Sequence, residues 1–395
     1  MEDRSITLKE ALAIVGKIDP IKKEELLPLS QLLNRIVSRD VFSTVDMPPF
    51  DKSAMDGYAC RRDNLDKTLT VIGEATAGGS YKGVVANFES VRIMTGAPIP
   101  EGATMVVMKE IAIEENGMVR FTKIPSNSNI CFKGEDIKVG ELLIQKGTKI
   151  TSRHIATLAA SGYSESYVFK QPKVAIYATG NELTEPGHSL LDGKIYNSNS
   201  YQLMAECQLI GVEASYRGIL PDVKEKVLLA LNDDSQTFDL VILSGGVSVG
   251  DYDFIPTVLQ ELGFNTEFQT LSTKPGKHTL LASKEGCHIL GLPGNPVSTL
   301  TQFEFVGKAI LNALQGVKKE RDITFKAPIA NDFIRKSADR LEFLPANLNE
   351  LGEVKLLNYN GSAHIVALSK ATILIQIEQG VTSLKKGDLV HVRPL

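Results

Sequence analysis

The stretch DLVILSGGVSVGDYDF, residues 239–254, joins a short apolar run to a glycine-rich loop. The apolar run is suited to a buried strand, and it leads directly into Gly245, Gly246 and Gly250. Glycine lets the backbone of a loop approach a ligand closely. Two aspartates follow the glycines, and no lysine lies in this stretch to neutralise a phosphate. The loop therefore predicts a ligand that uses backbone amides and carboxylates side by side.

The same strand-to-helix pattern recurs on either side of this stretch. Within residues 171–318, KVAIYAT precedes NSYQLMAECQLIG, ASYRGIL precedes DVKEKVLLALND, and CHILGLPG precedes PVSTLTQFEFVGKAILNAL. Strands that alternate with helices indicate βαβ units and a mainly parallel sheet covered on both faces. We therefore predict a doubly wound, mainly parallel α/β domain over residues 171–318, with its ligands at the carboxyl ends of the strands.

Three further regions flank this domain. Residues 46–139 contain β-branched runs broken by Gly, Pro and Asn, and Asn116-Gly117 is a hairpin signal, so they predict an inserted β-rich domain. Residues 1–45 and 140–170, which include the helical patterns ITLKEALAIV and RHIATLAASG, predict a connector domain made of two halves. Residues 319–395 return to β patterns, among them HIVALSKATILIQIE, and predict a small C-terminal β-barrel or sandwich.

Composition excludes several classes of protein. The 395 residues exceed one ordinary core, and the net charge of −4 favours neither a nucleic-acid partner nor a membrane partner. The four cysteines are scattered without a CxxC pair, which argues against a zinc site and fits a reducing compartment. The polar start MEDRSITLKE does not resemble a signal peptide, and no apolar run is long enough to cross a bilayer. We expect a cytoplasmic protein.

Three loops of the α/β domain are candidates for ligand binding. They are ATGNELTEPG, LSGGVSVGDYD and GLPGNPVS, and each follows an apolar strand. The second and third lead into helices, whose free amides bind anions. The turn STKPGKHT adds Lys274 and Lys277, which suit phosphate or another oxyanion, although a solvated surface turn is the alternative. The spacing matches neither a P-loop nor a dinucleotide-binding fingerprint.

Acidic residues accompany these loops. Asp56 lies in SAMDGYAC, Asp136 in FKGEDIKVG, Glu182 in the first loop, Asp222 in ILPDV and Asp253 after the glycines. Asp222 also suits a helix N-cap, and Asp136 a turn. Carboxylates beside an anion site either share a divalent cation such as Mg²⁺ or accept hydrogen bonds from the N–H groups of a heterocycle. The sequence therefore predicts a phosphorylated heterocycle as ligand, with oxyanion or metal chemistry nearby.

Seven segments in order carry a family resemblance. They are PFDKSAMDGYA, RIMTGAPIPEGATMVV, GEDIKVGELLIQKGTKI, ATGNELTEPG, LSGGVSVGDYDF, STKPGK and GLPGNPVS. Together they resemble the motifs of the molybdopterin molybdenumtransferase family of the MoeA type, to which the E domain of gephyrin is similar. The resemblance implies a four-domain subunit in a homodimer. It also implies insertion of molybdenum from molybdate into adenylylated molybdopterin, with release of AMP and formation of molybdenum cofactor.

The resemblance also implies roles for individual residues. The positions that match the family's catalytic residues are Asp56, Thr95, Asp136, Glu182, Asp222 and Asp253. The substrate-binding positions are Gly245, Gly246, Ser248, Gly250, Lys274, Lys277, Pro293, Gly294, Asn295, Pro296 and Ser362. Glu182 and Asp253 would hold Mg²⁺, and Asp56 and Thr95 would reach the site from the facing subunit. The dithiolene sulfurs of the substrate would capture molybdenum, so no protein cysteine is needed.

Two other functions stay open on the sequence. A molybdopterin adenylyltransferase of the same pathway resembles the 171–318 domain alone, and a gephyrin-like protein can act as a non-enzymatic scaffold. The acids Asp56, Asp136, Glu182 and Asp253 favour an enzyme over a scaffold. Expected partners are the adenylyltransferase and the molybdoenzymes that accept the cofactor.

Overall fold

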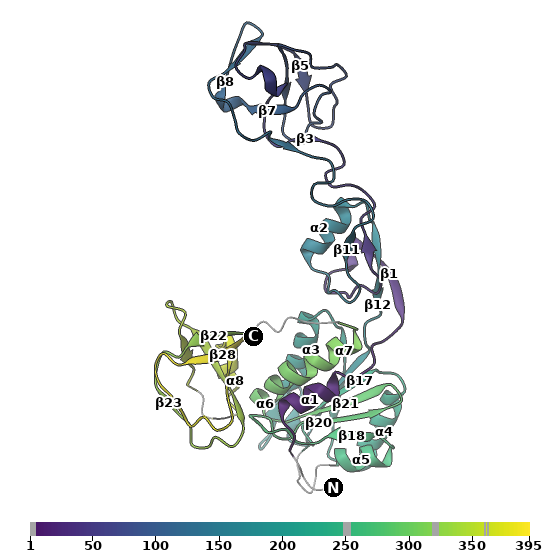
Figure 1. Cartoon of the computed structure of the whole chain (residues 1–395). Coiled ribbons are helices and arrows are strands. Elements are labelled where there is room, and N and C mark those ends of the chain that lie inside the picture. Colours follow the sequence, from purple (N-terminus) through teal and green to yellow (C-terminus); the bar gives the residue numbers. More distant parts are fainter. Residues whose placement is uncertain (1–4, 248–253, 318–323, 359–360, 362) are drawn as a thin grey trace.

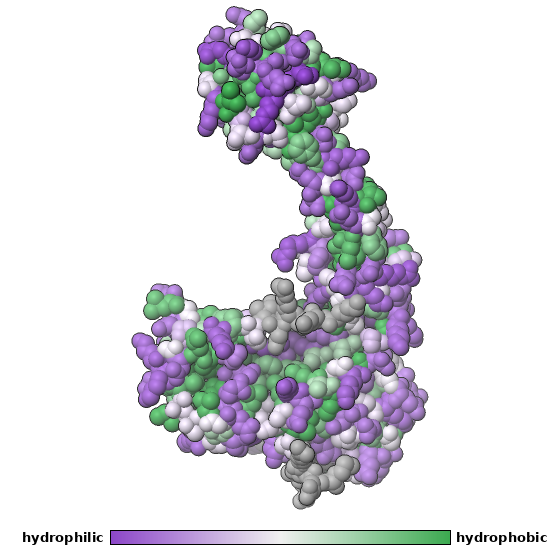
Figure 2. Space-filling view, in the orientation of Figure 1, coloured by the Kyte–Doolittle hydropathy of each residue, from purple (hydrophilic) through white to green (hydrophobic). Residues whose placement is uncertain are grey.

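This computed structural model describes residues 5–247, 254–317, 324–358, 361 and 363–395. Figure 1 shows an elongated molecule with a β-rich domain at one end and a narrow connector that leads to the α/β and C-terminal domains at the other. The space-filling view in Figure 2 shows an open concavity between these two ends. The predicted multidomain α/β-plus-β fold is confirmed. No helix within the described ranges has the length and apolar character that crossing a membrane requires.

The α/β domain is built on a six-stranded sheet in the order β16-β13-β17-β21-β20-β18. The first four strands are mutually parallel, and β20 pairs antiparallel with both β21 and β18, so the sheet is mainly parallel as predicted. The strands are β13 (Val174–Thr179), β16 (Ala214–Leu220), β17 (Leu240–Ser244), β18 (Asn265–Phe268), β20 (Leu280–Lys284) and β21 (Cys287–Leu292).

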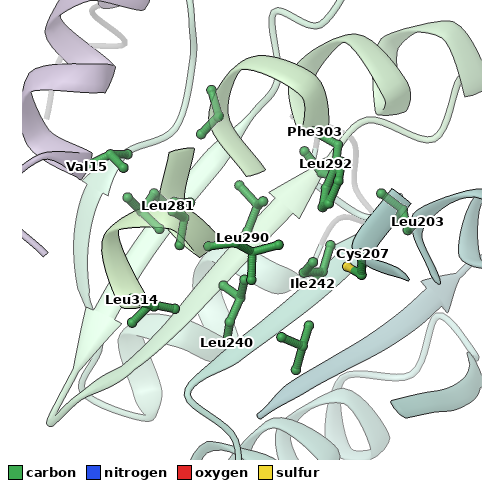
Figure 3. Close-up of a cluster of buried hydrophobic side chains, with 14 of the residues drawn as sticks. Val15, Leu203, Cys207, Leu240, Ile242, Leu281, Leu290, Leu292, Phe303 and Leu314 are labelled. Atoms are coloured by element: carbon green, nitrogen blue, oxygen red, sulfur yellow. The ribbon is translucent and has the colours of Figure 1, made fainter. Parts of the chain in front are cut away.

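Helices cover both faces of this sheet because successive side chains of a buried strand point to opposite sides. Ile176 of β13 belongs to one apolar core, shown in Figure 3, and the next residue, Tyr177, belongs to the other. The first core includes residues of α3 and α7, and the second includes residues of α4 and α5. The helices are α3 (Asn199–Leu209), α4 (Lys224–Ser235), α5 (Ile255–Glu261), α6 (Pro296–Gln302) and α7 (Lys308–Leu314), with the π-helical segment η4 (Phe303–Gly307) between the last two.

Helix α1 (Leu8–Val15) belongs to the α/β core, although we placed residues 1–45 in the connector. Ala11 and Val15 lie one turn apart and are fully or almost fully buried in the core of Figure 3, where Val15 faces the sheet. The short apolar face of α1 packs in the α/β core and not against the apolar cluster of the connector. The connector therefore begins after this helix.

The connector pairs a segment before the insertion with a segment after it. Strand β1 (Glu24–Pro28) runs antiparallel to β12 (Glu165–Phe169), and β2 (Val41–Phe42) runs antiparallel to β11 (Leu142–Ile144). Helix α2 (Ser152–Ala160) buries Leu158 against this pairing. A short 3₁₀ helix, η1 (Leu29–Gln31), follows β1.

The inserted β-rich domain contains a sheet in the order β7-β4-β6-β5-β9-β8. Asn116 and Gly117 both have positive φ, 52° and 75°, as the turn of the predicted hairpin β8-β9 requires. The main strands are β4 (Gly57–Cys60), β5 (Leu69–Ala75), β6 (Glu89–Ile93), β7 (Met105–Met108), β8 (Ala112–Glu115) and β9 (Met118–Phe121). The short elements are β3 (Lys52–Ser53), β10 (Ile130–Cys131), η2 (Arg62–Asn64) and η3 (Lys109–Ile111).

The C-terminal domain is a β-sheet, but closure into a barrel is not confirmed. Its strand path is β19-β24-β26-β28-β22, and in the described residues the two end strands, β19 and β22, do not pair with each other. The strands are β22 (Phe325–Pro328), β23 (Phe333–Ile334), β24 (Leu341–Leu348), β25 (Val354–Leu356), β26 (Ile373–Ile377), β27 (Ser383–Leu384) and β28 (Leu389–Pro394). The edge strand β19 (Thr273–Lys274) comes from the α/β region of the chain, so the two domains share a sheet.

One predicted strand of this domain is partly a helix. Residues of HIVALSKATILIQIE form α8 (Ile365–Ser369) before they enter β26. Leu368 of α8 packs on Val297 and Leu300 of α6. This contact across the domain boundary gives the apolar side chains of α8 a partner that a local pattern could not predict.

Candidate functional site

The three candidate loops meet at the carboxyl edge of the parallel strands. The Gly245 N–H donates to the Leu292 carbonyl at 2.9 Å, which joins the second loop to the end of β21. Gly245 has φ +97°, and a Cβ there would lie 2.7 Å from the Thr179 carbonyl oxygen at the end of β13. A Cβ on Gly294 would lie 3.8 Å from the Gly245 Cα. Gly245 therefore allows three strand ends to approach one another.

The second loop is only partly described. Gly245 and Gly246, with φ +97° and +65°, adopt conformations that favour glycine. Ser248, Gly250 and Asp253 lie outside the described residues, and so does Ser362.

The third loop is held rigidly at the start of α6. Asn295 is the N-cap residue and Pro296 is the first helical residue, as its fixed φ favours. The Thr299 hydroxyl donates to the Pro293 carbonyl at 2.6 Å, and the Asn199 side chain donates to the Gly294 carbonyl at 2.7 Å. Loop GLPGNP is therefore fixed from two helices.

Glu182 of the first loop is exposed, and Asp222 is hydrogen-bonded to this loop. The Asn181 N–H donates to Asp222 Oδ2 at 2.9 Å, and the Asp222 N–H donates to Asn181 Oδ1 at 3.3 Å. The Asp222 carboxylate does not cap α4, whose N-cap residue is Val223. Asp222 therefore positions the loop that carries Glu182.

A cavity of about 600 Å³ lies between the α/β and C-terminal domains. The α/β region contributes predicted site residues to its lining, and the C-terminal domain contributes charged residues that our reading of the sequence missed. The first group is Lys274, Lys277, Pro293 and Asn295, and the second is Arg335, Lys336, Arg340 and Glu342. With five cationic side chains and one carboxylate among these eight residues, the cavity favours an anion.

Lys274 is anchored by a carboxylate of the C-terminal domain. Its Nζ lies 2.7 Å from Glu342 Oε1, and the two residues are paired in the register of β19 and β24. The Glu342 side chain is 5% exposed, and Arg335, only 2% exposed, lies 3.4 Å from its other oxygen. Arg335 in turn donates to the carbonyl of Glu378 at 2.5 Å. Lys277 is exposed and has no ion-pair partner among the described residues.

A second predicted pair lies in the distant β-rich domain. Asp56 Oδ1 accepts hydrogen bonds from the Thr95 N–H at 2.8 Å and from the Thr95 hydroxyl at 2.7 Å, and Lys109 Nζ lies 3.4 Å from Oδ2. The Thr95 N–H, more than the Lys109 charge, lowers the pKa of Asp56. A Cβ on Gly57 would lie 1.9 Å from the Val107 carbonyl oxygen, so the MDG turn requires glycine. The structure therefore holds an ionised carboxylate at this position.

Asp136 does not join this pair through any described hydrogen bond. It lies exposed in a turn, where its N–H donates to the Met47 carbonyl at 3.0 Å. Figure 1 places the whole β-rich domain at the far end of the chain from the carboxyl edges of β17 and β21. One chain by itself therefore brings together Asp56 with Thr95, and separately the three loops, the third of which also lines the cavity.

Comparisons with known proteins identify the family. Three family models match in sequence order: the MoeA N-terminal region (domain I and II) over residues 6–162, a probable molybdopterin binding domain over 175–313, and the MoeA C-terminal region (domain IV) over 326–395. The molybdopterin molybdenumtransferase of Haemophilus influenzae is 36% identical, over 94% of this chain and 93% of the relative. The one from Staphylococcus epidermidis is 33% identical, over 98% and 95%.

The chain belongs to the MoeA family. A solved MoeA structure from Pyrococcus horikoshii covers 99% of this chain and 100% of its own, with a TM-score of 0.84 and 27% identity. A second structure of the protein from that organism has a TM-score of 0.78 and 30% identity, with 99% of each chain covered. The resemblance carried by the seven sequence segments is thus confirmed over nearly the whole length.

The donor set of this MoeA-family chain does not by itself establish a metal site. Among the described residues, no group of three or more His, Cys, Asp or Glu side chains is placed to hold a metal ion. Of the two predicted Mg²⁺ ligands, only Glu182 is described, and Oδ2 of Asp222 accepts a hydrogen bond from the Asn181 N–H. Burial raises the pKa values of Cys60, Cys207 and Cys287 to about 12, so these thiols stay protonated at neutral pH.

Proposed function

We propose that this chain inserts molybdenum from molybdate into adenylylated molybdopterin, releasing AMP and forming molybdenum cofactor. Membership of the MoeA family supports a transferase of molybdenum cofactor biosynthesis. The observation that carries the proposal is the cationic cavity at the carboxyl edge of the sheet, where Lys274 and Lys277 meet Pro293 and Asn295. Ligands of doubly wound folds bind at this edge.

The cavity half of the site would bind the anionic groups of both substrates. The Gly245 and Gly294 loops bring backbone close to the phosphates of the nucleotide, and Lys277 attracts molybdate as an unpaired charge. Lys274, held by Glu342, supplies a second cation in a fixed position. Fixed charges of this kind stabilise negative charge that develops as AMP leaves. The substrate's own sulfurs receive the metal.

The other half would come from a second subunit, because the β-rich domain that carries Asp56 lies at the opposite end of the chain from the α/β and C-terminal domains (Figure 1). We infer a homodimer in which the Asp56–Thr95 pair of one protomer enters the concavity of its partner seen in Figure 2. The ionised carboxylate of Asp56 suits the N–H groups of a pterin or a cation near the molybdate. Mg²⁺ stays a prediction that depends on Glu182 together with Asp253.

The proposal is tested with purified protein, adenylylated molybdopterin and molybdate. We expect AMP release that depends on molybdate, together with molybdenum retained on the pterin product. AMP release without molybdenum transfer would contradict the proposal. Consumption of ATP with formation of adenylylated molybdopterin would instead identify an adenylyltransferase. Transfer of the product to an apoenzyme tests the expected molybdoenzyme partner in the same reaction.

A further inference from the structure

A larger cavity, of about 1100 Å³, lies at the opposite edge of the α/β sheet. Lys173 lies just before β13, Asp239 lies just before β17, and His288 is the second residue of β21, and all three line it. It is thus separated from the proposed catalytic edge by the length of a strand, roughly 16 Å for five residues. No described residue of the proposed catalytic site lines this cavity.

Five lysines line this amino-edge cavity: Lys17, Lys22, Lys23, Lys170 and Lys173. They come from three segments that the fold brings together: the end of α1, the entry to β1, and the link from β12 to β13. The Lys170 N–H donates to the Lys23 carbonyl at 2.8 Å, which fixes two of these segments side by side. All five ammonium groups are on exposed residues without an ion-pair partner in the described parts of the chain.

The residues that line the cavity carry an excess of positive charge. Its carboxylates are Asp19, Asp239 and Glu267, so the five lysines leave an excess of two positive charges. One oxygen of Asp239 is already occupied by the Lys173 N–H at 2.7 Å. Burial lowers the pKa of His288, so this side chain adds no charge at neutral pH. A dianion would neutralise the excess.

Part of the lining is apolar. Leu281 and Leu314, which belong to the core in Figure 3, lie beneath it, and the partly buried Ile14, Ile18 and Ile21 line one side. Ser283 Oγ and His288 Nδ1, 2.8 Å apart, add a polar pair. A small ligand that fits both features has an apolar or ring-shaped body and one dianionic group.

We propose that the amino-edge cavity is a second ligand site, distinct from the catalytic site, that binds a small phosphate monoester with an apolar body. A phosphate monoester carries close to two negative charges at neutral pH, which matches the excess of the lining. The lysines bind the phosphate, and the isoleucine side accepts the body. Since three of the lysines lie where the connector joins the α/β domain, the ligand bridges these two parts of the chain.

Phenyl phosphate is the probe for a calorimetric titration of the full chain, without any molybdopterin compound. We expect binding near ~1 mM or tighter that weakens with salt. The variant Lys22→Gln/Lys170→Gln/Lys173→Gln should bind at least about tenfold more weakly, because each lost charged contact weakens binding substantially. The control Lys82→Gln/Lys226→Gln/Lys355→Gln, which changes the net charge equally at exposed lysines outside the cavity, should bind like the wild type.

A further pair of variants separates this site from the catalytic cavity and from loss of folding. Lys274→Gln/Lys277→Gln should retain the binding that the first variant loses, and Lys22→Arg/Lys170→Arg/Lys173→Arg should keep it. Equal binding by the Gln variant and its control would overturn the proposal, as would no binding by the wild type. Tighter binding of an acidic peptide than of phenyl phosphate would also overturn it. These outcomes do not depend on the proposed molybdenum transfer, which is measured in a separate assay.

Discussion

The Asp56–Thr95 pair and the Lys274–Lys277 turn are both anchored, but in different ways. Asp56 is fixed by a backbone N–H and a hydroxyl of one neighbouring loop in the same small domain. Lys274 is fixed by Glu342, which belongs to a strand about 70 residues further along the chain, in another domain. The first arrangement needs only the β-rich domain to fold, whereas the second also needs the C-terminal domain to dock.

The two halves of the proposed site therefore depend on different domains. The β-rich domain presents a carboxylate that is held only by its own residues Thr95 and Lys109 among the described contacts, and the cavity presents cations from two domains. A substitution in one half of such a site can inactivate that half and leave the other half intact.

Replacement of Asp56 should abolish most activity and leave the fold intact. In Asp56→Asn the amide oxygen still accepts from Thr95, but the negative charge is lost, and we expect molybdenum insertion to fall by about 10²–10³-fold. The melting temperature should stay that of the wild type, because Asp56 is exposed. The matched control is Asp66→Asn, which removes an exposed aspartate paired with Lys67 in the same domain. Wild-type activity in Asp56→Asn would mean that the β-rich domain does not contribute to the site.

Mixed dimers test whether the halves come from different subunits. Asp56→Asn subunits and Glu182→Ala subunits each retain one intact half, so random mixing should restore about a quarter of wild-type activity through heterodimers with one complete site. Mixing Asp56→Asn with Thr95→Val should restore none, since both changes damage the same half. Recovery is measured after dissociation and reassociation of differently tagged chains. An absence of recovery in proven heterodimers would mean that each site is built within one chain.

The sequence predicted local features well and contacts between domains poorly. The glycines of the second loop and the Asn116-Gly117 hairpin follow from backbone conformations that few residues adopt, so the sequence indicates them directly. The burial of α1 in the α/β core and the helix at Ile365–Ser369 depend on surfaces contributed by distant segments. Glu342 was missed for the same reason, because nothing local to RLEF indicates a partner in the KPGK turn.

Neutralising Lys277 should weaken the use of molybdate. Its charge is exposed and unpaired within the described residues, so Lys277→Ala should need about ten- to a hundredfold more molybdate for half-maximal rate. Higher ionic strength should bring the wild type toward the variant, because a solvent-facing charge is screened. The control is Lys284→Ala, an exposed lysine of the same domain that bonds to the Leu262 carbonyl away from the cavity. An unchanged molybdate dependence in Lys277→Ala would mean that this lysine does not bind molybdate. The backbone amides of the loops would then bind the oxyanion.

The smallest effect should distinguish the two lysines from each other. Both lie on one turn, but only Lys274 contacts a buried carboxylate. In Lys274→Ala, Glu342 keeps Arg335 at 3.4 Å and loses its closer partner at 2.7 Å, so the C-terminal domain docks less firmly. Because Lys274 is 46% exposed, solvent reduces the loss, and we expect about 1 kcal/mol less stability than in the wild type. Lys277→Ala should lose almost none. Urea unfolding of both variants measures the difference. Equal stabilities of Lys274→Ala and Lys277→Ala would mean that Arg335 alone satisfies Glu342, and that the turn is held by its own backbone.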